Sequence, residues 1–218
     1  MKKAIKILSL ITAIYTITTT SIAQADTSKS GLYVGVDALR SFAKHKYLAE
    51  GHHLRINGTH SRNESNGFGV NMGYKVAAKK AFIAPEIFYE KISNSAKDFG
   101  YERNPPIREN SLNIDQRYGA KINVGYNFAS KFNVFANIGM TNTNYTIKLL
   151  GIPTGDHITQ KVAQFTMIYG AGLSYDINNN WSLKASYDWQ QFNARYDLGV
   201  EKDRILLQTV KAGIAYKF

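Results

Sequence analysis

The chain has 218 residues, of which 44% are hydrophobic, and a mean hydropathy of −0.28 with a formal net charge of +11. No apolar run reaches the roughly 18 residues that a membrane-spanning helix needs, which excludes a helical membrane protein but not a membrane β-barrel, whose strands are only half apolar. Cysteine is absent, so disulfides, thiol nucleophiles and cysteine metal ligands are excluded.

The N-terminal residues have the three parts of a secretory signal peptide. A basic start, a short uncharged middle and a small-x-small end follow one another: Lys2, Lys3, Lys6, 7–17 and 23–25. We expect residues 1–25 to be cleaved and residues 26–218 to form one exported domain. Cleavage removes three lysines and lowers the formal net charge to +8. Export makes nucleic acid an unexpected partner despite the basic balance.

The rest of the chain alternates apolar and polar residues with a period of two, which is the spacing of β-strands. In the clearest segment, Ile114, Gln116 and every second residue to Phe128 lie on one face, opposite charged, polar and glycine residues. Eight segments have this pattern: 31–42, 67–76, 81–93, 114–128, 132–148, 164–175, 181–190 and 210–218.

The connections between these segments alternate in length. Short ones fall at 77–80, 129–131 and 178–180, and long ones at 43–66, 94–111, 149–161 and 191–203. Aromatic residues gather near the strand ends, where a membrane interface would lie. The pattern predicts an all-β fold: an eight-stranded antiparallel up-and-down transmembrane β-barrel with four long extracellular loops. The alternative is a soluble β-sandwich or lipocalin-like barrel, but glycines on the polar face favour the membrane barrel.

If the apolar faces contact lipid, the polar faces fill the lumen, with six acidic and six basic residues. Asp176 and Lys217 lie near the strand ends, and the others form a predicted lumen charge network: Asp37, Lys75, Glu86, Glu90, Asp115, Arg117, Lys121, Lys184, Asp188 and Lys211. Matched charges can pair, whereas unpaired buried charges are costly. An eight-stranded barrel has room only for side chains or one small ligand. We therefore predict a plugged lumen; the alternative is a narrow porin or transporter for a small or apolar solute.

The signal peptide, the eight strands, the loop alternation and the final residues Tyr216-Lys217-Phe218 resemble the OmpA/OmpX/opacity-type outer-membrane barrels. This resemblance implies that Tyr216 and Phe218 form the signal read by the barrel assembly machinery. It implies partners in outer-membrane lipid and lipopolysaccharide, with loops at the surface of a Gram-negative cell. The Lys-, Asn- and Ile-rich composition is similar to small surface barrels of rickettsia-type bacteria, some of which are adhesins for host serum or matrix proteins.

The sequence gives little support for a catalytic or metal-binding site. Four histidines, His45, His52, His53 and His60, are scattered over the first long loop without the spacing that fixes metal ligands. A weak metal or pH-dependent site there is the alternative to a solvated basic loop, which could also meet acidic glycans or lipopolysaccharide phosphates. His157 has no serine and carboxylate spaced for acyl transfer. We expect no enzyme activity, no metal and no cofactor, and the ligand-binding residues of the four loops stay unassigned.

Overall fold

The computed structural model describes residues 30–48, 62–93, 96–100, 108–128, 130–151, 157–195 and 202–218. The predicted signal peptide, residues 1–25, lies outside this part of the chain. Among the described residues, no helix is long and apolar enough to cross a membrane. The described strands are β1 (Gly31–Leu48), β2 (Arg62–Ala78), β3 (Ala81–Ser93), β4 (Ala96–Gly100), β5 (Arg108–Asn127), β6 (Phe132–Gly151), β7 (His157–Asp176), β8 (Trp181–Arg195) and β9 (Lys202–Lys217).

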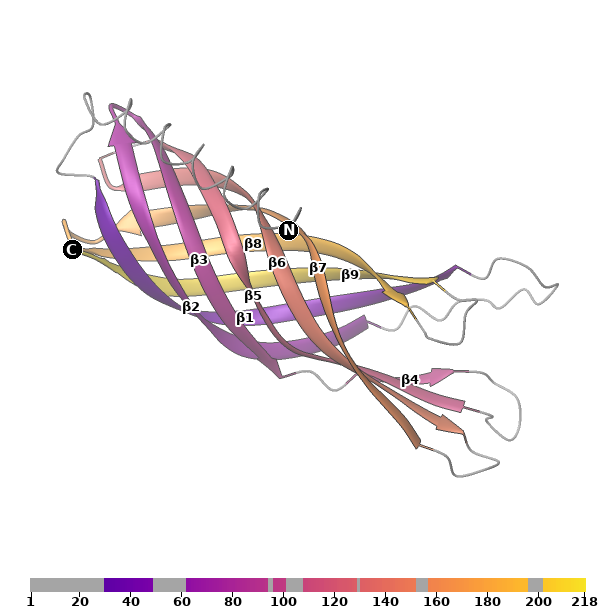
Figure 1. Cartoon of the computed structure of the whole chain (residues 1–218). Coiled ribbons are helices and arrows are strands. Elements are labelled where there is room, and N and C mark those ends of the chain that lie inside the picture. The colour runs from indigo at the N-terminus through magenta and orange to yellow at the C-terminus, as the bar shows by residue number, and fades with distance from the viewer. Residues whose placement is uncertain are drawn as a thin grey trace, which may run out of the picture.

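The strands form one antiparallel sheet that closes on itself (Figure 1). The order is β3-β2-β1-β9-β8-β7-β6-β5-β4, and pairing of β3 with β5 closes the ring. The short strand β4 pairs with the same edge of β5 as β3 does, farther along it, so the wall has eight strands. The predicted eight-stranded barrel is confirmed. Where neighbouring strands are paired all the way round, closure leaves no backbone amide at an open edge, which lipid would not tolerate.

One end of the barrel, here called the turn end, carries the short connections. These are the turn Lys79–Lys80, residues 128–131 and residues 177–180. The described ends of the chain meet there, because the backbone N–H of Phe218 donates to the carbonyl of Leu32 at 2.9 Å. The opposite end is the rim. Short connections at one end and long ones at the other agree with the predicted alternation.

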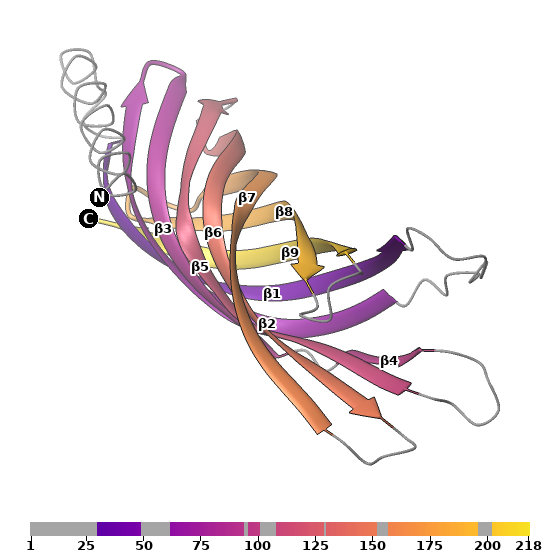
Figure 2. The same cartoon turned by 45° about the vertical axis from the view of Figure 1, so that its right-hand side comes forward.

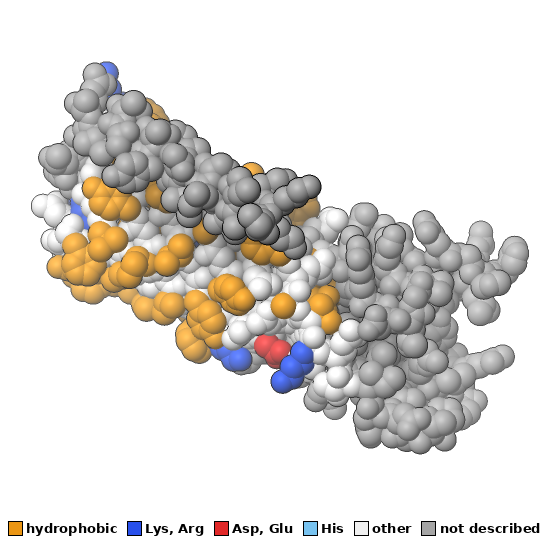
Figure 3. All heavy atoms as spheres, in the orientation of Figure 1, with side chains coloured by type: hydrophobic (Ala, Val, Ile, Leu, Met, Phe, Trp, Pro, Cys, Tyr) orange, Lys and Arg blue, Asp and Glu red, His pale blue; other side chains and the backbone are white. Residues whose placement is uncertain are grey.

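The outer wall is an apolar belt, because every second residue of each strand points outward. Hydrophobic side chains cover much of the described wall in Figure 3. Aromatic residues border the belt at the turn end: Tyr74, Tyr126, Phe128, Phe132, Trp181 and Tyr216. A second group lies toward the rim: Tyr89, Tyr118, Tyr169 and Trp189. Two aromatic borders around an apolar band are typical of membrane barrels.

A bulge in β5 changes the face of one predicted residue. The register with β6 shifts between Ile114 and Gln116, so Asp115 is the extra residue. Ile114 therefore points inward and is 0% exposed, while Gln116 stays on the outer face and accepts a hydrogen bond from Tyr89. The prediction that Ile114 lies on the lipid face was wrong, because a single extra residue reverses the alternation.

The strands run farther toward the rim than the sequence pattern indicated. Parts of all four predicted long loops, 43–66, 94–111, 149–161 and 191–203, are strand: 43–48, 62–66, 96–100, 108–111, 149–151, 157–161, 191–195 and 202–203. These loop boundaries were therefore wrong. The remainder of each loop lies outside the described residues.

The sheet splits at the rim. Pairing of β7 with β8 stops at Ile168↔Gln190, although both strands continue beyond it. Pairing of β2 with β3 stops at Asn66↔Ser93. The strands β4 to β7 diverge from β8, β9, β1 and β2 in both views (Figures 1 and 2). We call the gap between β7 and β8 the seam.

The interior has three levels. Toward the rim, an apolar cluster joins Leu39, Ala43, Ile92, Ile114, Tyr145, Phe192, Ile205 and Leu207. Toward the turn end, a smaller cluster joins Ala77, Phe82, Ala84 and Phe135, with Tyr33 against it. Charged side chains fill the level between them, and these form the candidate site.

Candidate functional site: an ion network across the lumen

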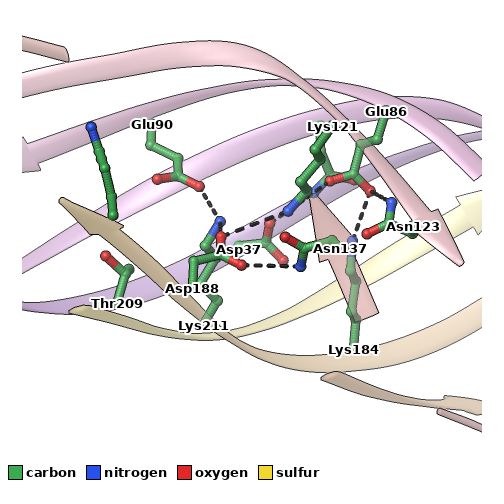
Figure 4. Close-up of polar contacts among 12 residues, drawn as sticks. Asp37, Glu86, Glu90, Lys121, Asn123, Asn137, Lys184, Asp188, Thr209 and Lys211 are labelled. Atoms are coloured by element: carbon green, nitrogen blue, oxygen red, sulfur yellow. Dashed lines mark hydrogen bonds and ion pairs between the residues drawn. The ribbon is translucent and has the colours of Figure 1, made fainter. Parts of the chain in front are cut away.

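Strand alternation directs charged side chains from several walls into the same section of the lumen. Glu86 and Glu90 project from β3, Arg117 and Lys121 from β5, and Lys184 and Asp188 from β8. Lys211 projects from β9. In the strand order, β3 and β8 lie on opposite sides of the ring, so contacts between them cross the whole lumen. Figure 4 shows the charged side chains that it labels on β3, β5, β8 and β9 converging in the lumen.

Glu86 is the first centre of the network. Its Oε2 accepts hydrogen bonds from Lys184 Nζ at 2.8 Å and from Tyr33 Oη at 2.7 Å. Asn123 Nδ2 donates to the same oxygen at 3.3 Å, and Lys121 Nζ lies 3.2 Å from Oε1. One buried carboxylate therefore joins side chains from β1, β3, β5 and β8.

Asp188 is the second centre. Its Oδ2 lies 2.5 Å from Lys211 Nζ, 3.7 Å from Lys121 Nζ and 4.0 Å from Arg117 Nη2. Asn137 Nδ2 donates to its Oδ1 at 3.2 Å. Lys121 thus connects the two centres, since it also pairs with Glu86.

Glu90 completes the network by pairing with Arg117 and with Lys211. The side chains of Arg117 and Asp188 are 0% exposed. Because water is excluded, this set of charges is stable only when each has opposite partners at close range. Asp37 accepts a hydrogen bond from Asn71 Nδ2 at 2.7 Å, and its charge interacts with those of nearby network lysines.

The ten predicted network residues do not all meet. Ion pairs join seven of them: Glu86, Glu90, Arg117, Lys121, Lys184, Asp188 and Lys211. Lys75 lies nearer the turn end, with Nζ 4.4 Å from the centroid of the Phe82 ring. Asp115 lies at the β5 bulge, where Thr146 Oγ1 donates to it at 2.8 Å. Asp115 therefore belongs to a local contact with β6, and within the described part of the chain it forms no ion pair with the seven.

Neutral residues extend the network, and the sequence prediction missed them. Tyr33, Asn123 and Asn137 bond to its carboxylates. Gln190 accepts a hydrogen bond from Arg117 at 3.3 Å and donates to two threonines, Thr143 and Thr166, at 2.7 Å each. Their inward position follows from the period of two. An amide or phenol without charge gave no separate signal in the sequence.

Glycines on the inner face provide space for the charged side chains. A Cβ atom at Gly170 would overlap the carboxylate of Asp188, and one at Gly213 would overlap that of Asp37. A larger residue would not fit at these glycines, because a neighbouring strand presents a large side chain at the same level.

The two predicted assembly residues lie at the turn end. Phe218 is 67% exposed, and its ring contacts that of Tyr216 with centroids 5.0 Å apart. Tyr216 also packs edge-on against Trp181 at 4.9 Å. Both residues are accessible from outside the barrel, and their role as an assembly signal stays a prediction.

Catalytic and metal-binding groups were not predicted, and the described residues hold no group of three or more His, Asp or Glu side chains placed to bind a metal. His52, His53 and His60 lie outside the described residues, as does the side chain of His45.

A closed antiparallel barrel with an apolar outer belt and a charged interior defines a β-barrel membrane protein. A family model described as outer membrane protein beta-barrel domain matches residues 10–218, so the chain belongs to this family. The barrel therefore lies in the outer membrane of a Gram-negative bacterium, in contact with its lipid. In this family the short turns face the periplasm and the rim faces outward.

The chain is similar to solved structures, and its similarity to OprG supports the fold. OprG from Pseudomonas aeruginosa is similar with a TM-score of 0.56 and 12% identity, over 87% of this chain and 97% of that chain. Neisserial surface protein A has a TM-score of 0.47 and 17% identity, over 87% and 98% of the two chains. Ail of Yersinia pestis, solved in complex with the heparin analogue sucrose octasulfate, has a TM-score of 0.47 and 13% identity, over 86% and 99%. None of the curated proteins searched matches the chain.

Proposed function

We propose that this chain is a surface barrel with a plugged lumen that acts as an adhesin or envelope-structural protein through its extracellular loops, without enzyme activity. The observation that best supports the plugged lumen is the ion network. Six buried charged side chains and the half-buried Lys184 bond across the lumen, and an apolar cluster lies above them. A continuous water-filled path would have to break these ion pairs, so diffusion through the barrel is not its function.

The rim supports the second part of the proposal. The outer ends of the strands extend beyond the aromatic residues of the belt and become polar, as at the exposed Arg40–Glu64 ion pair. A rigid sheet that holds loops above a membrane is a suitable scaffold for binding. Host serum or matrix proteins and lipopolysaccharide are the partners that we propose.

Loop deletions test the adhesive role. Cells that display the barrel are applied to surfaces coated with serum proteins or with matrix extract. We expect deletion within at least one of the loop segments 49–61, 101–107, 152–156 or 196–201 to lower binding by about tenfold or more, as when an interface hot spot is lost. Heat-modifiable gel mobility must stay unchanged. The control is Lys79→Gln in a turn at the opposite end. Undiminished binding after every deletion would contradict adhesion.

Conductance tests the plug against the alternative, a narrow porin or transporter for a small or apolar solute. That alternative is favoured by a cavity of about 300 Å³ in the turn end of the lumen. In planar bilayers, we expect the purified barrel to show no steady channel, because the network blocks the path above this cavity. Steady conductance from the unaltered chain would overturn the plugged barrel and favour the porin.

A further inference from the structure

The cavity at the turn end is lined from all sides of the barrel. Its deep wall includes Ala84 and three side chains that bond to Glu86 of the ion network: Tyr33, Asn123 and Lys184. Residues of two turns border its mouth: Ser130, Lys131, Asn178, Asn179 and Asn180. The cavity is therefore blocked toward the rim and lies at the periplasmic end. Its volume, about 300 Å³, is at the low end of small-molecule sites.

The lining carries an excess of positive charge. It contains four lysines, Lys75, Lys131, Lys184 and Lys217, and one acidic residue, Asp176. Lys184 is partly neutralised by its ion pair with Glu86. Lysines outnumber acidic side chains in the lining by four to one. A small anion entering from the periplasm would therefore be attracted, and more strongly at low salt.

Two phenylalanine rings form rigid apolar walls. Lys75 Nζ lies 4.4 Å from the centroid of Phe82, and Lys184 Nζ lies 5.5 Å from that of Phe135. Each ring lies against a glycine of a neighbouring strand, Gly125 or Gly172, where a Cβ atom would overlap it. The rings are therefore held against the barrel wall, where they line the cavity. The site thus combines ammonium groups with flat apolar surfaces and is already formed.

One buried polar atom in the lining has no partner among the described residues. Asn123 is 3% exposed, and its Nδ2 donates to the carbonyl of Ala84 and to Glu86. These two bonds orient the amide, and Oδ1 is left without a hydrogen bond. A buried acceptor of this kind costs free energy until a donor reaches it. A ligand with a hydroxyl group would supply that donor.

We propose that this cavity binds a small organic anion from the periplasm, a hydroxycarboxylate, with its carboxylate at the lysines and its hydroxyl donated to Asn123 Oδ1. The ligand has a hydrocarbon body that packs against the two phenylalanine rings that line the cavity. Because the network closes the cavity toward the rim, the site holds its ligand without passing it outward. It is independent of the loops, so adhesion and this binding can each fail alone.

Calorimetry on the refolded mature chain in detergent tests the proposal with four probes: malate, succinate, succinamide and inorganic phosphate. Malate and succinate have the same charge, but only malate carries a hydroxyl group. We expect malate to bind most tightly, succinate more weakly and the neutral succinamide not at all. Phosphate separates a general anion site from a carboxylate site: binding as tight as that of malate would overturn the carboxylate assignment.

Variants assign the residues. Lys75→Gln should raise the malate dissociation constant about tenfold, the value of one charge-assisted hydrogen bond. Asn123→Ala should reduce malate binding to the level of succinate. The matched control is Lys79→Gln, which removes the same charge from an exposed turn position. Heat-modifiable mobility verifies that each variant folds. No malate binding by the unaltered chain, or equal binding by Lys75→Gln and the parent, would overturn the site.

Discussion

Replacing Asp188 with alanine is expected to lower the free energy of unfolding by about 3–5 kcal/mol, the cost of breaking a buried ion pair from one side. Asp188 lies within 4.0 Å of Lys211, Lys121 and Arg117. Without its carboxylate, these three cations share only the two glutamates and repel one another in a space without water. Urea titration of the detergent-refolded barrel, followed by heat-modifiable mobility, measures the change.

Two comparisons make the Asp188 result specific. Asp188→Asn keeps the volume and the bond to Asn137, so a similar loss would identify charge as the cause. Glu64→Gln weakens the exposed Arg40–Glu64 pair and should cost only about 0–1 kcal/mol. If Asp188→Ala and Glu64→Gln shift the urea midpoint equally, the buried network does not stabilise the barrel.

Gly172→Ala is expected to destabilise the barrel by about 1–3 kcal/mol, the usual cost of overpacking. The new Cβ atom would overlap the Phe135 ring and lie 2.6 Å from the backbone oxygen of Ala185. A paired strand cannot move its carbonyl without losing ladder hydrogen bonds, so the clash is not relieved by a side-chain rotation. The same urea titration reports the loss.

Gly69→Ala is the matched control, because it adds the same methyl group on the inner face of another strand. Its Cβ would lie 3.0 Å from Glu90 Cγ and 3.4 Å from the backbone oxygen of Tyr89. Glu90 needs to shift by only a few tenths of an ångström, and alanine restricts the unfolded chain more than glycine does. We expect a change of less than about 1 kcal/mol. Equal losses at Gly69 and Gly172 would refute the steric explanation.

The alternation of residue types was enough to predict the barrel and most of its faces, because lipid on one side enforces apolar side chains there. It failed at Ile114, since a bulge reverses the faces without any gap in the pattern. The polar Gln116 in an otherwise apolar series was the available signal. It also failed at segments such as 62–66, where both faces are polar and no apolar alternation marks the strand.

The charges of the lumen were predictable as a set, but their partners were not. Glu86 and Lys184 are 98 residues apart in sequence and meet across the lumen. Their heights depend on the stagger of all the strands between them, and a shift of one residue pair would change every partner. The same limit explains why Asp115 was assigned to the network although it lies at the bulge beside Thr146.

The seam also limits how deep the protein can sit in its bilayer. Above Ile168↔Gln190, one edge of β7 has no paired strand. Unsatisfied amides are not stable in hydrocarbon, so the acyl chains of the outer leaflet must end at or below this level. The contacting rings of Tyr169 and Trp189, with centroids 6.4 Å apart, occupy the next pair down the ladder. An aromatic pair of the kind found at membrane interfaces therefore lies directly below the level at which the backbone pairing ends.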